Sequence, residues 1–164
     1  MPIVSFSTLP DASRVWIFGT DDPVHGESSA RLLGEVDRFL AQWKAHGVPL
    51  SCARDWRDDH FLTIAVDTTQ ESASGCSIDG LFRTLQALER ALGTRIVAGG
   101  RVFYRDAGGG VRTASRAEFS ALAERGVISP DTAVFDTSLT MLGDWRSRFE
   151  APARAAWTAP LLAR

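Results

Sequence analysis

The run Phe61-Leu-Thr-Ile-Ala-Val66 constrains the fold more than any other feature of the sequence, because five of its six residues are apolar. A strand that faces water on one side alternates between apolar and polar residues. A strand that is covered on both sides is apolar almost throughout. The run therefore predicts the central strand of a sheet. Shorter apolar or alternating runs predict the strands around it, at Arg14–Gly19, at Leu50–Asp55 and within 94–104.

Two segments have the periodicity of amphipathic helices. Apolar residues recur every three or four positions over 28–46, and again over 78–92. This spacing places them along one face of a helix. A glycine follows each segment, Gly47 after the first and Gly93 after the second, and glycine is the residue that most often ends a helix. We therefore expect two helices with apolar faces turned toward the sheet.

The order of these elements over 14–104 is β-α-β-β-α-β, which predicts an α+β fold with a ferredoxin-like core. The chain after this core carries signals for further elements. A glycine-rich loop joins 102–104 to 111–113 as a hairpin, and the last short strand is expected at 132–135.

The end of the chain is expected to pack on the rest. Ser115 and Glu118 have the spacing of a capping box and predict a short third helix. Trp145, Phe149 and Trp157 are expected to dock the tail on the body of the protein. We therefore expect a single domain over 1–164, in which 14–104 is the core and 105–164 is an extension packed on it.

Composition and charge narrow the functional classes. A chain of 164 residues with 45% hydrophobic residues can bury the core of one ordinary domain. Its net charge is −2 with both signs interspersed, which argues against a nucleic-acid surface. No signal-peptide pattern opens the sequence, and no apolar run approaches the roughly 20 residues that span a bilayer. We expect a cytoplasmic protein without cofactor, nucleic-acid or membrane partners, and leave open a homodimer.

The turn that follows the central strand is the candidate functional site. Backbone N–H groups at a helix N-terminus are unpaired and carry partial positive charge, which suits a phosphate or carboxylate. Serine hydroxyls and a glycine beside these groups would add hydrogen-bond donors and room. The expected ligand-binding residues are Asp67, Ser72, Ser74, Gly75, Ser77 and Asp79.

Cys76 lies in the same turn and offers a second hypothesis. The helix dipole favours the thiolate form of a cysteine at this position, so that Cys76 could act as a catalytic nucleophile. A catalytic thiol needs a base. His25 is the histidine best placed to be one, if its loop and the turn both follow the carboxyl ends of parallel strands. A purely structural role is the alternative, with Ser77 as an ordinary N-cap and Cys76 as a small packed side chain.

Two further groups of charged residues are weaker candidates. Five carboxylates near the same edge of the sheet could hold a metal, although their spacing fits no known loop: Asp21, Asp22, Asp67, Glu71 and Asp79. Five arginines beside strands could bind nucleic acid or an acidic partner, although arginines that cover apolar surface are more common: Arg54, Arg57, Arg101, Arg105 and Arg112.

The segments Phe39–Gly47, Phe61–Asp67 and Ala73–Asp79, the last reading ASGCSID, resemble a family of small uncharacterised bacterial proteins. Members of that family are often labelled ABC-transporter ATPases, and the label implies an ATP-binding site. The Gly-x-x-x-x-Gly-Lys-Ser/Thr motif of such a site is missing here, so that ATPase activity is not expected. Three hypotheses follow: a non-catalytic anion-binding or accessory protein, a thiol-dependent enzyme, and an interaction or scaffold module without chemistry.

Overall fold

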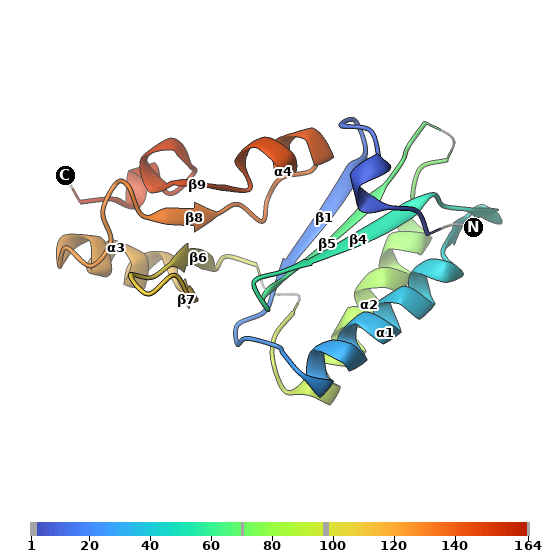
Figure 1. Cartoon of the computed structure of the whole chain (residues 1–164), viewed down its shortest axis with the longest axis horizontal. Helices are drawn as coiled ribbons and strands as arrows, with labels where there is room; N and C mark the ends of the chain where they lie inside the picture. Colours follow the sequence, from blue (N-terminus) through green and yellow to red (C-terminus); the bar gives the residue numbers. More distant parts are fainter. Residues whose placement is uncertain (1–2, 70, 97–98, 164) are drawn as a thin grey trace.

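β5 (Phe61–Val66) is the central strand of a three-stranded antiparallel sheet, between β1 (Arg14–Gly19) and β4 (Cys52–Arg57). The computed structural model describes residues 3–69, 71–96 and 99–163. All six residues of β5 are buried, which confirms the predicted central strand. We call β1, β5 and β4 the N-terminal sheet (Figure 1).

Two helices cover one face of this sheet, as their apolar periodicity predicts (Figure 1). They are α1 (Glu27–Ala41) and α2 (Gly75–Leu92). Leu32, Val36 and Leu40 of α1 are fully buried, as are Leu81 and Leu85 of α2. The predicted end of α2 is confirmed, because Gly93 caps the helix with a φ of 70°.

The first helix is shorter than predicted. It ends at Ala41, and the residues that follow form a small hairpin of β2 (Lys44–Ala45) and β3 (Val48–Pro49). His46 and Gly47 form its turn with φ angles of 52° and 78°. Two consecutive positive φ angles suit a tight hairpin turn, so that His46 lies in a β-turn and not at the end of a helix.

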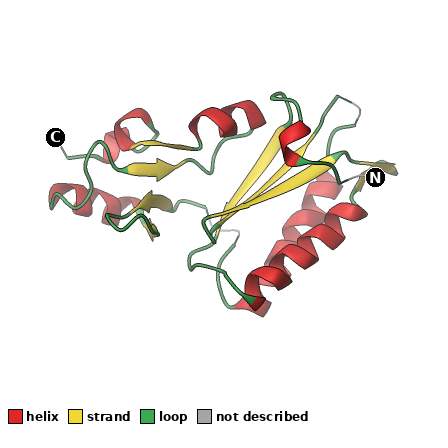
Figure 2. Ribbon diagram, viewed as in Figure 1, coloured by secondary structure: helices red, strands yellow, loops and turns green. Residues whose placement is uncertain are grey.

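A second sheet, the C-terminal sheet, has the strand order β7-β6-β8-β9 (Figure 2). Its strands are β6 (Val102–Arg105), β7 (Val111–Ala114), β8 (Ala133–Phe135) and β9 (Glu150–Pro152). The helices of this half are α3 (Arg116–Glu124) and α4 (Leu142–Arg148). Three short 3₁₀ segments complete the described elements: η1 (Phe6–Thr8), η2 (Ala153–Ala155) and η3 (Ala159–Leu161). The β6–β7 hairpin, the capping box at Ser115 and the strand at β8 confirm the sequence predictions.

The α+β class is confirmed, but the sheet differs from the predicted ferredoxin-like arrangement. The fourth strand of that arrangement, β6, pairs with β7 and β8 and not with β1. β1 runs antiparallel to β5, as in that arrangement, but without β6 beside it β1 takes an edge of its sheet. Part of its outer edge is occupied by the chain after β8, because the N–H of Val15 donates to the carbonyl oxygen of Thr140 over 2.9 Å. No local pattern in the sequence encodes this long-range choice of partner.

The second face of the N-terminal sheet is covered by aromatic residues from 99–163, which we call the C-terminal half; the described residues before it are the N-terminal half. Phe61 is fully buried, and its ring centroid lies 4.6 Å from that of Phe135, 5.1 Å from Phe149 and 5.2 Å from Phe103. Trp145 stacks on Phe149 at 5.8 Å. The two halves therefore share one hydrophobic cluster, in which Trp145 and Phe149 dock as predicted. Trp157 packs on a separate cluster formed within the C-terminal half.

Within the described residues, no helix combines the length and the apolar character needed to cross a membrane.

Candidate functional site

The turn that precedes α2 is organised by Ser74. The N–H of Ser77 donates to Oγ of Ser74 over 3.2 Å, and Oγ of Ser77 donates to the carbonyl oxygen of Ser74 over 2.8 Å. The N–H of Ile78 also donates to that carbonyl, over 2.9 Å. Ser74 is therefore the N-cap, and the expectation that Ser77 has this role is wrong. Ser77 is the first buried residue of the helix instead.

The cap leaves two amides at the start of α2 available. Ser77 and Ile78 are satisfied by Ser74, whereas Gly75 and Cys76 are too early in the helix to donate within it. Neither of these N–H groups has an acceptor among the described residues. Both residues are exposed. The N-terminus of this 18-residue helix thus has two unpaired N–H donors, which carry the partial positive charge of the helix dipole.

Beside these amides is a hollow of about 350 Å³, between the end of α1 and the start of α2. We call it the α2 hollow. Its lining residues are Phe39, Gln42, Trp43, Lys44, Cys76, Ser77 and Gly80. Lys44 is the only lysine of the chain, and it has no carboxylate partner among the described residues. Trp43 fixes the wall of the hollow, because its Nε1–H donates to the carbonyl oxygen of Ser77 over 2.8 Å.

The structure separates the other predicted ligand residues from this hollow. Asp67 binds its own loop, with Oδ1 accepting from the N–H of Thr69 over 3.0 Å and from its hydroxyl over 2.7 Å. These hydrogen bonds lower the pKa of Asp67. Ser72 and Asp79 are exposed and are absent from the lining of the hollow. Of the predicted site residues, Cys76 and Ser77 line the hollow, and Ser74 and Gly75 precede them at the start of α2 without lining it.

His25 cannot serve Cys76, because the parallel strands on which that role depended are not present in the described part of the chain. β1 and β5 are antiparallel, with Gly19 opposite Phe61 and Arg14 opposite Val66. The loop after β1 therefore lies at the end of the sheet opposite to the Cys76 turn. His25 lines a small hollow with Leu92 and Gly93, at the far end of α2. About 24 Å of helix separates Leu92 from Cys76 at 1.5 Å per residue.

The same antiparallel pairing divides the predicted carboxylate cluster. Asp21 and Asp22 lie at the far end of the sheet, where Asp21 is 3.7 Å from Arg101 and Asp22 accepts a hydrogen bond from Thr94. Asp67 lies at the other end, after β5. Among the described residues no group of histidine, cysteine or carboxylate side chains is arranged to hold a metal ion.

The predicted arginine surface consists of ion pairs. Arg54 binds Asp37 through two hydrogen bonds of 2.7 and 2.9 Å. Arg105 bridges Glu150, at 2.8 Å, and Asp58, at 3.2 Å. The other arginines are also paired, Arg57 with Glu150, Arg101 with Asp21 and Arg112 with Asp106. Each of these five arginines therefore has an acidic side chain beside it.

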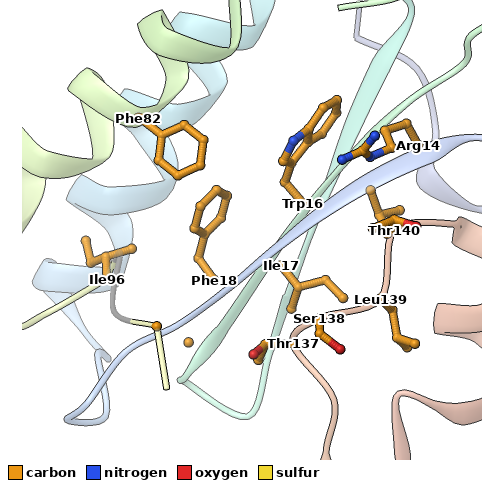
Figure 3. A pocket seen from close by; sticks show the side chains of 13 residues that line it. Arg14, Trp16, Ile17, Phe18, Phe82, Ile96, Thr137, Ser138, Leu139 and Thr140 are labelled. Carbon is orange, nitrogen blue, oxygen red and sulfur yellow. The ribbon is translucent and has the colours of Figure 1, made fainter. Parts of the chain in front are cut away.

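A second hollow, of about 280 Å³, follows β1 between α2 and residues 137–140 (Figure 3). We call it the β1 groove. Sequence reasoning missed it, because its walls come from segments that are far apart in the chain. It also missed Lys44, which the predicted long helix would have placed on a different element. Comparison with models of known protein families, with curated proteins and with solved structures finds no match.

Proposed function

We propose that this protein binds a small anionic ligand, through a phosphate or carboxylate group, in the α2 hollow. The observation that carries the proposal is that Lys44 and Cys76, whose amide is free, line the same hollow at the start of α2. A cation and a helix N-terminus that converge on one hollow both favour an anion.

The expected affinity of this arrangement is modest. An anion at an exposed helix N-terminus gains about 0.3 to 1 kcal/mol, and up to about 2 kcal/mol where it is partly buried. A hydrogen bond to a charged group adds about 1.5 to 3 kcal/mol. Together these contributions reach about 2 to 5 kcal/mol, which corresponds to a Kd of about 0.2 to 35 mM for a single phosphate group. A natural ligand would gain more from contacts of its remaining atoms with Phe39 and Gln42.

The lining of the hollow favours binding over thiol chemistry. Cys76 is exposed and lines the hollow, as a nucleophile would. A catalytic cysteine also needs a general base within hydrogen-bond reach. Among the described residues, the lining includes no histidine and no carboxylate. The hypothesis of a thiol-dependent enzyme therefore has less support than the binding hypothesis.

The proposal can be tested by titrating the protein with inorganic phosphate and measuring its melting temperature. We expect saturable stabilisation at millimolar phosphate, because a ligand that binds only the folded state stabilises it. Lys44→Gln should weaken phosphate binding about tenfold, through the loss of one charge-assisted hydrogen bond. Arg31→Gln is the matched control, because it removes one positive charge from an exposed position at the opposite end of α1.

A second readout follows the ligand at Cys76 itself. Phosphate bound in the α2 hollow should slow the alkylation of Cys76 by iodoacetamide, because the thiol lines the same hollow. Sodium chloride at equal ionic strength serves as the control for screening. If phosphate neither stabilises the protein nor slows alkylation, or if Arg31→Gln has the same effect as Lys44→Gln, the anion-binding proposal is wrong.

A further inference from the structure

The β1 groove has apolar walls. Figure 3 shows β1 crossing between α2 on one side and residues 137–140 on the other. Phe18 and Phe82 pack edge to face on the α2 side, with ring centroids 5.6 Å apart. Ile17 and Leu139 contribute to the other side. A ligand that fills this groove must therefore present apolar surface along most of its length.

Arg14 supplies the groove with one positive charge. Its guanidinium carbon lies 5.1 Å from the centroid of the Trp16 ring, which orients the side chain along the wall (Figure 3). Arg14 is exposed, and it has no carboxylate partner among the described residues. Arg54 and Arg105, in contrast, are each paired with acidic side chains. The charge of Arg14 is therefore not balanced by the described part of the protein.

The other polar groups of the groove, like Arg14, favour a negatively charged ligand. Thr137 and Thr140 provide hydroxyl groups on the wall opposite to α2, and neither hydroxyl has a hydrogen-bond partner among the described residues. Ser138 donates its own hydroxyl to Asp136. No carboxylate side chain belongs to the described lining. The groove thus combines one unbalanced cation and free hydroxyl donors with an apolar body.

We propose that the β1 groove binds a small monocarboxylic acid with an apolar chain. The carboxylate pairs with Arg14, and the chain lies along Phe18, Phe82 and Leu139. Charge complementarity requires the acid, since a neutral apolar molecule would leave Arg14 unpaired. The volume of about 280 Å³ lies just below the range of about 300 to 1,000 Å³ of sites for drug-sized ligands, so that a short chain is expected. This site uses residues different from those of the α2 hollow, and the inference is independent of the proposed function.

The experiment is calorimetric titration of the full-length protein with butanoate, hexanoate and octanoate, each below its micellar concentration. Affinity should rise about fourfold for each methylene that enters the groove. Arg14→Gln should weaken octanoate binding about tenfold, because it removes the charge-assisted contact. Arg83→Gln is the matched control, since Arg83 is an exposed arginine of α2 with no ion pair among the described residues. Octan-1-ol should bind wild type and Arg14→Gln equally.

Several results would overturn the inference. They are an absence of octanoate binding at millimolar concentration, an unchanged affinity in Arg14→Gln, and an equal loss of affinity in Arg83→Gln. Loss of octanoate binding in Lys44→Gln would also overturn it, because the ligand would then occupy the α2 hollow. Phosphate and octanoate should not compete. Failure of phosphate binding with octanoate binding retained would refute the proposed function alone.

Discussion

Gly19 lies at a close contact between the two halves of the protein, and its replacement by alanine tests their packing. Gly19 is the last residue of β1, and the ring of Phe103 from β6 lies directly against it. A Cβ atom added to Gly19 would lie 2.4 Å from Cζ and 2.8 Å from Cε2 of Phe103. Ordinary contacts of a Cβ atom begin at about 3.4 Å. The Phe103 ring would therefore have to move by about 1 Å.

The ring has little room for this movement. Phe103 is 2% exposed and packs edge-on against Phe61 at 5.2 Å. Overpacking of a well-packed core costs about 1 to 3 kcal/mol. In a domain of this size, each kcal/mol shifts the melting temperature by roughly 2 to 4 °C. We therefore expect Gly19→Ala to lower the melting temperature by roughly 2 to 12 °C.

A double-mutant cycle with Phe103→Leu assigns the loss to this contact. Leucine is smaller than phenylalanine and leaves space for the new methyl group, so that the double variant should be more stable than the sum of the single effects predicts. We expect a coupling energy of about 0.5 to 3 kcal/mol, measured by urea unfolding. Gly34→Ala is the control, because Gly34 lies in α1 with open space around it, and alanine there should stabilise the helix by up to about 1 kcal/mol. If Gly19→Ala is neutral, or if the two changes are additive, the packing argument is wrong.

Three further predictions concern titration, reactivity and capping. Burial raises the pKa of Asp55, so that its charged form is disfavoured in the folded state. Asp55→Asn should therefore raise the free energy of unfolding at pH 7. This gain should disappear as the pH falls below the ordinary pKa of 3.8. Burial also raises the pKa of Cys52 to about 12, whereas Cys76 is exposed. Iodoacetamide at pH 8 should therefore modify Cys76 alone in the folded protein and both cysteines in urea. Mass spectrometry of the alkylated protein measures this difference. Ser115→Ala removes the hydroxyl that accepts the N–H of Glu118 and should cost about 0.5 to 2 kcal/mol in urea unfolding, whereas an unchanged midpoint would show that the capping box contributes nothing.

The elements of the fold could be predicted because each is encoded locally. The burial of all six residues of β5 follows from its apolar run, and the capping box at Ser115 follows from its own sequence. Which strands pair with one another is not encoded locally. Whether β6 adds to β1 or starts another sheet depends on what covers β1, and the residues concerned, around Thr140, are more than a hundred positions away.

The candidate site could be predicted only in part for the same reason. The serine- and glycine-rich sequence before α2 predicts a turn that leads into a helix, and the N-terminus of α2 lies there. Lys44 was missed because the 3.6-residue periodicity continues through Trp43, although the chain has left the helix by then. The role proposed for His25 failed because strand direction, which decides the end of the sheet where each loop lies, has no signature within a single strand.

The shared aromatic cluster has a consequence for biosynthesis. The face of the N-terminal sheet that carries Phe61 is covered by Leu139, Leu142 and Phe149, which the ribosome adds more than seventy residues after β5. At about 5 to 20 residues per second, this face stays incompletely covered for roughly 4 to 17 s while the nascent chain grows. A stalled or truncated chain without Phe149 would expose apolar surface on this face of the N-terminal sheet, and such surface promotes aggregation. We expect such fragments to be substrates for chaperones that hold unfinished chains.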